Sequence, residues 1–329
     1  MLTKIAVIGS NSFSGSDFID LILEKKRFKV IGISRSPEKS DIFLPYKRHG
    51  SSRFSFFQMD LNQDLKKICR FLNDFKPQYV VNFAAQSEVA PSWEHPEHWF
   101  QTNTVALAGL INHLRSAKYL KKYLHISSPE VYGSCEGTVT EKAPLNPSTP
   151  YAASKAAADL LLMTFVKNFN FPLITIRSTN VYGAHQQLFK IIPRSIINIR
   201  KGIKIRLHGG GRAVKSYIHI RDISRGELLA LKKGKIGEIY HLSPAKGISV
   251  KNAVKLICDK MKVDFTKAMI TVGERLGQDK AYVIDSSKIR RLGWSEQTSL
   301  DKGLRDVISW IDKNWQVIKN MPSDYKHTP

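Results

Sequence analysis

The stretch that decides the fold is residues 4–18, KIAVIGSNSFSGSDF. An apolar, β-prone run leads through a turn rich in glycine and serine into a helical pattern. Gly9 and Gly15 fit the tight turn and the close packing that let a pyrophosphate sit at the helix N-terminus, and Ser12 stands where a middle glycine is usual. Alone, the motif would also fit an ordinary turn before a helix. In this context it predicts a dinucleotide-binding unit.

The rest of the first half repeats this strand and helix alternation. We predict strands at 4–9, 28–33, 79–83, 123–127 and 173–177. Between them, amphipathic or capped stretches predict helices at 15–26, 62–75, 97–118 and 150–169. Such alternation is typical of βαβ units, so the expected fold class is α/β, with a doubly wound, Rossmann-like parallel sheet.

The alternation breaks after about residue 180. Glycine-rich and basic segments follow, together with a strand in EIYHLS (238–243) and helical runs at 250–261 and 299–318. We therefore expect a second, smaller α/β lobe that binds substrate. The predicted division is 1–180 plus 217–244 for the dinucleotide-binding domain, and 181–216 plus 245–329 for the lobe.

The composition limits the function classes. The 329 residues carry 51 Lys and Arg against 28 Asp and Glu, a net charge of +23 that would attract polyanions. The basic residues are dispersed without a nucleic-acid motif, so we expect no nucleic-acid partner. There is no long apolar run and no signal-peptide pattern, which predicts a cytosolic protein without a membrane partner. The cysteines lack ligand spacing, so no metal site is expected: Cys69, Cys135 and Cys258.

The end of the second predicted strand bears on the cofactor. An NAD enzyme usually has Asp or Glu there, but this chain has Ser34 and Arg35, whose hydroxyl and guanidinium suit a 2′-phosphate. We predict NADP rather than NAD, although Arg35 could also be merely exposed. Asp60 could accept from the adenine or cap a helix. The predicted cofactor contacts are Gly9, Asn11, Ser12, Phe13, Gly15, Ser34, Arg35, Asp60, Leu61, Ala84, Ala85, Tyr151 and Lys155.

The pair Tyr151 and Lys155 carries the strongest chemical signal. Residues four apart share a helix face, which places a phenol beside an ammonium. A tyrosine can act as a base near neutral pH only if a nearby cation stabilises the phenolate. Ser127 and Ser128 end the fourth predicted strand, at the sheet edge where ligands bind in this fold.

An ordered set of motifs runs along nearly the whole chain: GSNSFSG, MDL, NFAAQS, HISSPEVYG, PYAASK, RSTNVYG, the GGG run at 209–211 and RLGQDKAYVID. Through these motifs the sequence resembles the extended short-chain dehydrogenases that act on nucleotide sugars, most of all the dTDP-glucose and GDP-mannose 4,6-dehydratases. The resemblance implies that Ser128, Tyr151 and Lys155 are the catalytic Ser/Thr-Tyr-Lys set and that the substrate is a nucleotide-diphosphate sugar.

Within that resemblance, Glu130 selects the reaction. Dehydratases carry Glu there because a carboxylate must take the C5 proton, which a C4 ketone makes acidic. Pro129 stands where dTDP-glucose dehydratases have an Asp acid, so Glu130 is expected also to assist the departing hydroxyl. Glu130 could instead be a loop carboxylate. A 4-epimerase or reductase is the alternative enzyme, and a degenerate dehydrogenase that senses NADP or binds RNA is the non-enzyme alternative.

The resemblance also implies substrate contacts and an assembly. Ser87 and Glu88 are expected to border the sugar. Arg194 and Arg212 could be further anion contacts, but in so basic a protein a solvated surface position is favoured for both. Helices at 97–118 and 150–169 would form an intersubunit four-helix bundle in a homodimer, although the same apolar faces could also pack within one chain. The residues expected to contact the diphosphate or nucleoside are Asn180, Lys215 and Arg275.

Overall fold

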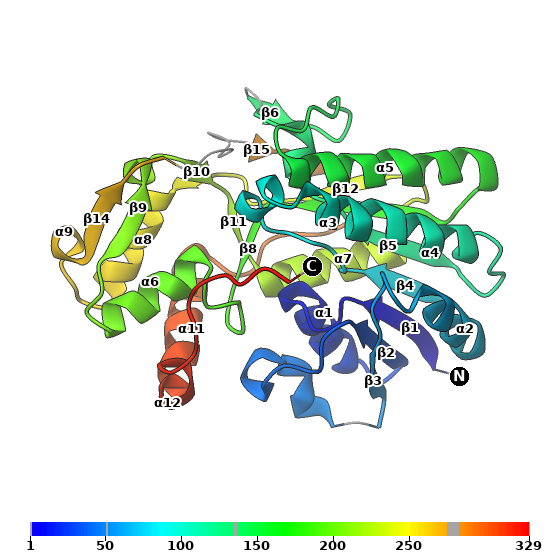
Figure 1. Cartoon of the computed structure of the whole chain (residues 1–329), viewed down its shortest axis with the longest axis horizontal. Helices are drawn as coiled ribbons and strands as arrows, with labels where there is room; N and C mark the ends of the chain where they lie inside the picture. Colours follow the sequence, from blue (N-terminus) through cyan, green and yellow to red (C-terminus); the bar gives the residue numbers. More distant parts are fainter. Residues whose placement is uncertain (1, 51, 135–136, 275–282, 329) are drawn as a thin grey trace.

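The computed structural model describes residues 2–50, 52–134, 137–274 and 283–328. A seven-stranded sheet forms its centre, in the order β12-β7-β5-β4-β1-β2-β3, and every neighbouring pair is parallel (Figure 1). Its strands are β1 (Thr3–Ile8), β2 (Phe28–Ser34), β3 (Phe54–Gln58), β4 (Tyr79–Asn82), β5 (Lys122–Ile126), β7 (Leu173–Ser178) and β12 (Ile239–Leu242). The predicted doubly wound parallel sheet is confirmed.

Helices cover both faces of the sheet, which explains why its strands read as nearly continuous apolar runs. On one face, α1 (Phe13–Leu23) and α7 (Ile220–Lys233) pack through side chains such as Phe18, Ile22 and Leu228. The opposite face is covered by α2 (Leu65–Phe75), α4 (Leu107–Leu114) and α5 (Pro150–Phe169). The strand order reverses between β1 and β4, and a ligand crevice forms at such a reversal.

The helix predicted over 97–118 is interrupted. It consists of α3 (Pro96–Phe100), a π-helical turn η4 (Gln101–Ala106) and α4. Asn103, buried inside the wide turn, accepts a hydrogen bond from the Gln86 N–H at 2.8 Å and donates to the Ser154 hydroxyl at 2.9 Å. These bonds join the loop after β4 to α5, and π-turns commonly occur beside functional sites.

The smaller lobe contains three helices, α6 (Ile191–Arg200), α8 (Val250–Lys260) and α11 (Leu300–Lys313), which pack around an apolar core. Two paired strands, β9 (Ile205–His208) and β14 (Met269–Val272), pack beside α8 in a second apolar cluster. Short elements complete the chain: η1 (Asp41–Phe43), η2 (Pro45–His49), η3 (Ala90–Trp93), η5 (Pro129–Tyr132), η6 (Gly209–Gly211), β6 (Thr138–Val139), β8 (Asn180–Tyr182), β10 (Val214–Lys215), β11 (Tyr217–His219), β13 (Ile248–Ser249), α9 (Phe265–Ala268), β15 (Val283–Ile284), α10 (Ser287–Arg290) and α12 (Trp315–Ile318).

The C-terminal segment, residues 319–328, leaves α12 and runs back across the middle of the molecule (Figure 1). Its end lies beside the loop that follows β4, because the Thr328 carbonyl accepts a hydrogen bond from the Gln86 side chain at 2.8 Å. Among the helices of the described ranges, none has the length and apolar character needed to cross a membrane.

Candidate active site

The loop between β1 and α1 forms the predicted dinucleotide turn. Gly9 has φ +82°, and a Cβ there would lie 2.5 Å from the Ala84 backbone nitrogen. A Cβ on Gly15 would lie 2.4 Å from the Gly9 carbonyl oxygen, so both positions need glycine. Ser12 is the N-cap of α1, and its hydroxyl accepts from the Gly15 N–H at 3.0 Å. The serine in place of a middle glycine thus caps the helix whose N-terminus faces the crevice.

A cavity of about 420 Å³ follows this loop along the ends of β1, β2 and β4. Asp60 takes part in a local turn there, since its carboxylate accepts from the Asn62 N–H at 2.8 Å. Four predicted cofactor residues lie outside this cavity: Phe13, Tyr151 and Lys155 line the neighbouring one, and Gly15 packs behind the loop. The predicted residues that line it are Gly9, Asn11, Ser12, Ser34, Arg35, Asp60, Leu61, Ala84 and Ala85.

The C-terminal segment forms part of this cavity, which the sequence analysis missed. Tyr325, Lys326 and Thr328 line it, and the Arg35 guanidinium donates to the Thr328 carbonyl at 3.0 Å. No periodicity or motif in the last residues indicated this position. Arg35 is therefore at the cleft, as the NADP prediction requires, and its side chain contacts the chain terminus.

The four predicted catalytic residues line one cavity of about 320 Å³ beside the dinucleotide loop: Ser128, Glu130, Tyr151 and Lys155. Ser128 ends the loop after β5 and caps η5, so its hydroxyl accepts from the Glu130 N–H at 3.2 Å. Tyr151 lies in the first turn of α5, which begins at a proline and is capped by the Thr149 hydroxyl. Two helix N-termini thus position these side chains.

Burial and neighbouring charges shift the pKa values of both Tyr151 and Lys155. Burial raises the pKa of Tyr151 and the nearby charge of Glu130 raises it further, while a hydrogen bond with Ser128 lowers it. Burial also lowers the pKa of Lys155 to about 8. The ammonium donates to the Ile126 carbonyl at 2.6 Å. Burial and the charge of Glu130 therefore favour the neutral phenol of Tyr151.

A buried polar network supports the floor of this site. Asp159, one helical turn after Lys155 on α5, raises the pKa of that lysine, opposing the effect of burial. Its carboxylate accepts from the Ser127 hydroxyl at 2.7 Å and from the Arg177 guanidinium at 2.6 Å. The sequence analysis did not find Asp159; its spacing from Lys155 on one helix face was the available signal.

The residues predicted to contact the sugar and the diphosphate line several neighbouring cavities. Glu88 is ion-paired with Lys190 at 2.5 Å at the mouth. Ser87 lines both the cavity with Tyr151 and the one with Arg35. Asn180 lies between the catalytic cavity and a third one, and within the described residues its buried Oδ1 has no hydrogen-bond partner.

The third cavity, about 630 Å³, belongs to the smaller lobe and is basic. It is lined by the predicted Lys215 and by Arg194, whose guanidinium is ion-paired with Asp324 of the same cavity at 2.8 Å. Arg212 is a surface residue, 3.4 Å from Glu274 in an exposed ion pair. The predicted Arg275 lies outside the described residues. Four cationic side chains that could face a diphosphate line this cavity: Arg194, Lys204, Arg206 and Lys215.

Comparison with known proteins decides the family. The model of the family described as GDP-mannose 4,6 dehydratase matches residues 7–307. The chain belongs to this family. The dTDP-glucose 4,6-dehydratase of Haemophilus influenzae is 30% identical, over 94% of this chain and 98% of that protein. A trifunctional protein of Arabidopsis thaliana, named for UDP-glucose 4,6-dehydratase and two further activities, is also 30% identical, but the chain spans 47% of its length.

Solved structures of this family and of related enzymes share the fold. The crystal structure of DesIV, a dTDP-glucose 4,6-dehydratase from Streptomyces venezuelae with NAD and TYD bound, superposes with a TM-score of 0.89 at 29% identity, covering 95% of this chain and 98% of that one. A UDP-glucuronic acid 4-epimerase from Bacillus cereus, bound to UDP-glucuronic acid and NAD, superposes with a TM-score of 0.87 at 25% identity. The match covers 94% of this chain and 99% of that one. The predicted family resemblance is confirmed.

Proposed function

We propose that this protein is a nucleotide-sugar 4,6-dehydratase, which converts an NDP-hexose to its 4-keto-6-deoxy derivative. The observation that carries the proposal is that Glu130 lines the same cavity as Tyr151 and lies close enough to affect its pKa. Elimination of water needs such a second acid/base group beside the redox site, because the C5 proton must be removed after C4 is oxidised.

The residues present fit a nicotinamide dinucleotide. The close approach of Gly9 to Ala84 leaves no room for a Cβ in the turn, as expected where a backbone must approach a pyrophosphate. Such a cofactor would accept a hydride from C4 of the sugar and later return it to C6, and its positive ring would favour the phenolate. Tyr151 takes the proton of the C4 hydroxyl, Ser128 steadies that oxygen by hydrogen bonding, and Lys155 supplies positive charge one helical turn away.

Glu130 carries the elimination step. Its carboxylate removes the proton from C5 of the 4-ketosugar, and the resulting carboxylic acid protonates the departing C6 hydroxyl as water. Pro129 offers no acid at the preceding position, so both transfers fall to Glu130. A hydride returned to C6 and a proton returned to C5 complete the product. That proton is balanced by the one that Tyr151 took from the C4 hydroxyl, and the oxidation state of the cofactor does not change overall.

The substrate side is proposed from the cavities. The sugar would lie near Ser87 and Glu88, and the diphosphate near Asn180 and Lys215. Charge-assisted hydrogen bonds from the basic cavity suit phosphate oxygens. Arg275 remains a proposed contact from the sequence alone.

A 4-epimerase is the second candidate, because the Bacillus cereus epimerase shares the fold at a TM-score of 0.87. The fold therefore does not select between the two reactions. Glu130 favours dehydration, since epimerisation needs only the C4 oxidation and reduction that Tyr151 serves.

The proposed reaction is tested by product mass. Purified protein is incubated separately with dTDP-glucose, UDP-glucose, GDP-mannose and UDP-N-acetylglucosamine, and each nucleotide sugar is examined by mass spectrometry. We expect one of them to lose one water. Conversion without change of mass would instead identify an epimerase, and no conversion of any of them would contradict the proposal for these substrates.

The cofactor is proposed to be NADP, although the DesIV and epimerase structures contain NAD. Ser34, Arg35 and Ser36 line the cavity where β2 ends, and none of these three supplies the carboxylate that usually binds a ribose 2′-hydroxyl. We predict that Arg35→Ala weakens binding of NADP⁺ by roughly ten- to a hundredfold, since a charge-assisted hydrogen bond is lost, and leaves NAD⁺ binding nearly unchanged.

Calorimetric titration of both dinucleotides measures this preference. Arg53→Ala serves as the control, because Arg53 donates to the carbonyls of Leu23 and Lys25 away from the cavity. An equal loss of affinity for NAD⁺ and NADP⁺, or none for either, would overturn the assignment of Arg35 to the 2′-phosphate.

We also propose the predicted homodimer, the division into a dinucleotide-binding domain and a smaller lobe at the predicted boundaries, and the cytosolic location. The dimer is supported by apolar side chains that remain exposed on the helical layer where the four-helix bundle is expected. These are Phe100, Val105, Leu160 and Phe169. The molar mass in solution, by light scattering, checks this assembly.

A further inference from the structure

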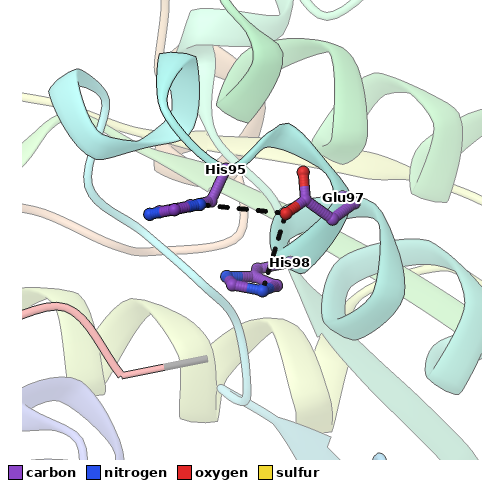
Figure 2. Close-up of side chains that lie close together, drawn as sticks. All are labelled: His95, Glu97 and His98. Carbon is purple, nitrogen blue, oxygen red and sulfur yellow. Dashed lines mark ion pairs between the residues drawn. The ribbon is translucent and has the colours of Figure 1, made fainter.

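A compact group of metal-ligand side chains lies outside the catalytic cavity, at the start of α3. Figure 2 shows His95, Glu97 and His98 grouped together, with dashed lines from one carboxylate oxygen of Glu97 to His95 and to His98. The Glu97 Oε1 lies 3.9 Å from His95 Nδ1 and 3.6 Å from His98 Nε2. One ligand atom from each residue falls within 4.8 Å of the others. All three are at least partly exposed, so an ion from solvent can reach them.

The residue types and spacings suit a divalent transition metal. Imidazole nitrogens and a carboxylate are ligands of zinc, and two such ligands in tetrahedral geometry lie about 3.4 Å apart. The two measured separations exceed this value by only a few tenths of an ångström. His95 and His98 are three residues apart at the beginning of α3, which places both rings on one side of the chain.

A fourth residue, from the other end of the chain, completes the arrangement. The His327 Nε2 lies 2.9 Å from His98 Nδ1, on the side of the His98 ring that faces away from Glu97. The His327 ring also stacks on His95, His98 and Trp99, at centroid distances of 5.0–5.4 Å. In metal sites the ligand histidine usually donates its other ring N–H to a carboxylate, a backbone carbonyl or water, which fixes its tautomer, and here the His327 Nε2 would be the acceptor.

The position of His327 links this group to the cofactor cleft. The next residue, Thr328, accepts hydrogen bonds through its carbonyl from Arg35 and Gln86, both of which line the cleft. An ion bound through His98 Nε2 would hold the proton on Nδ1 and strengthen the bond to His327. The end of the C-terminal segment would then be held over the cleft more firmly.

We propose that His95, Glu97 and His98 form a binding site for one divalent transition-metal ion of the zinc class, and that the bound ion fastens residues 325–328 over the dinucleotide cleft through His327. His95 Nδ1, Glu97 Oε1 and His98 Nε2 are the ligands, and solvent occupies the remaining coordination position. The absence of a metal site was predicted from cysteine spacing, and this cluster contains no cysteine.

Binding is tested on the untagged full-length protein by calorimetric titration with Zn²⁺ and by the visible absorption of Co²⁺. We expect one ion per chain. The double variant His95→Ala/His98→Ala loses this binding, while His113→Ala keeps it, because His113 is a partly exposed imidazole on α4 that contacts Asn73 instead. Wild-type protein without a Zn²⁺-binding step, or a double variant that binds as tightly as the wild type, would refute the site. Circular dichroism confirms that the variants are folded.

Amide hydrogen exchange tests whether the bound ion holds residues 325–328 in place through His327. Zn²⁺ slows amide exchange in the peptide covering residues 321–328 of the wild type and of His113→Ala. His327→Ala retains the three ligands, binds Zn²⁺ about ten- to a hundredfold more weakly, and shows no slowing even when saturated with the ion. Slowing that persists in saturated His327→Ala, or ion binding that leaves the peptide of the wild type unchanged, would show that the ion does not act through His327.

Discussion

Replacement of Glu130 by glutamine is expected to stop water loss while sparing the oxidation at C4. The amide keeps the size of the side chain and the Ser128-capped turn that positions it, but it cannot take the C5 proton. We predict a fall of about 10²- to 10⁴-fold in formation of the dehydrated product, the usual effect of losing a positioned acid/base group. Reduction of the bound cofactor on adding substrate, followed at 340 nm, should remain.

A matched control separates this effect from a general loss of carboxylates. Glu274→Gln changes an exposed carboxylate paired with Arg212 in the smaller lobe, and it should form product at the wild-type rate. If Glu130→Gln dehydrated its substrate normally, the assignment of the base would be wrong. If it also lost cofactor reduction, Glu130 would serve the redox step and the proposed division of roles would fail.

Lys155→Met is expected to lose activity and gain stability. The buried ammonium has a pKa lowered from 10.5 to about 8, so the unfolded chain binds this proton more tightly than the folded one. The charge therefore destabilises the fold fully below pH 8, and the penalty disappears as the pH rises from about 8 to 10.5. At pH 7 the free energy of unfolding of the variant should exceed that of the wild type by roughly 1–3 kcal/mol, after allowance for the lost hydrogen bond to the Ile126 carbonyl.

Two measurements check this prediction together. Urea unfolding at pH 7 and at pH 10 should show the added stability of Lys155→Met shrinking at the higher pH, and turnover should fall by at least about 100-fold. Lys167→Met, an exposed lysine near the end of the same helix, should change neither quantity strongly. If the variant were less stable than the wild type at pH 7, the buried charge of Lys155 would not be destabilising and this account of its pKa would be wrong.

Local sequence patterns predicted the parts of the site that local geometry determines. The turn at Gly9 and Gly15 and the pair Tyr151 and Lys155 depend on helix and turn geometry within a few residues, and the structure places them beside one crevice. The strand pattern likewise predicted the parallel sheet, because strands buried on both faces must be apolar throughout. The roles proposed for these residues in catalysis stay predictions.

The features that were missed depend on contacts between distant segments. The π-turn at η4 follows from the tertiary hydrogen bonds of Asn103, and no proline within 97–118 indicates an interruption there. The end of the chain reaches the cleft through single side-chain contacts with Arg35 and Gln86, which leave no periodic signal. The pKa of Tyr151 depends on burial and on Glu130, neither of which is visible in the spacing of Tyr151 and Lys155.

The path of the hydrogen on C4 tests the central claim most directly. The nucleotide hexose that loses water in the mass screen is prepared with deuterium at C4, converted by the wild-type protein, and examined by NMR. Internal transfer through Tyr151, Lys155 and the bound dinucleotide predicts that the deuterium appears at C6 of the 4-keto-6-deoxy product. Deuterium that is lost to solvent, or that stays at C4 in a product of unchanged mass, would contradict the account.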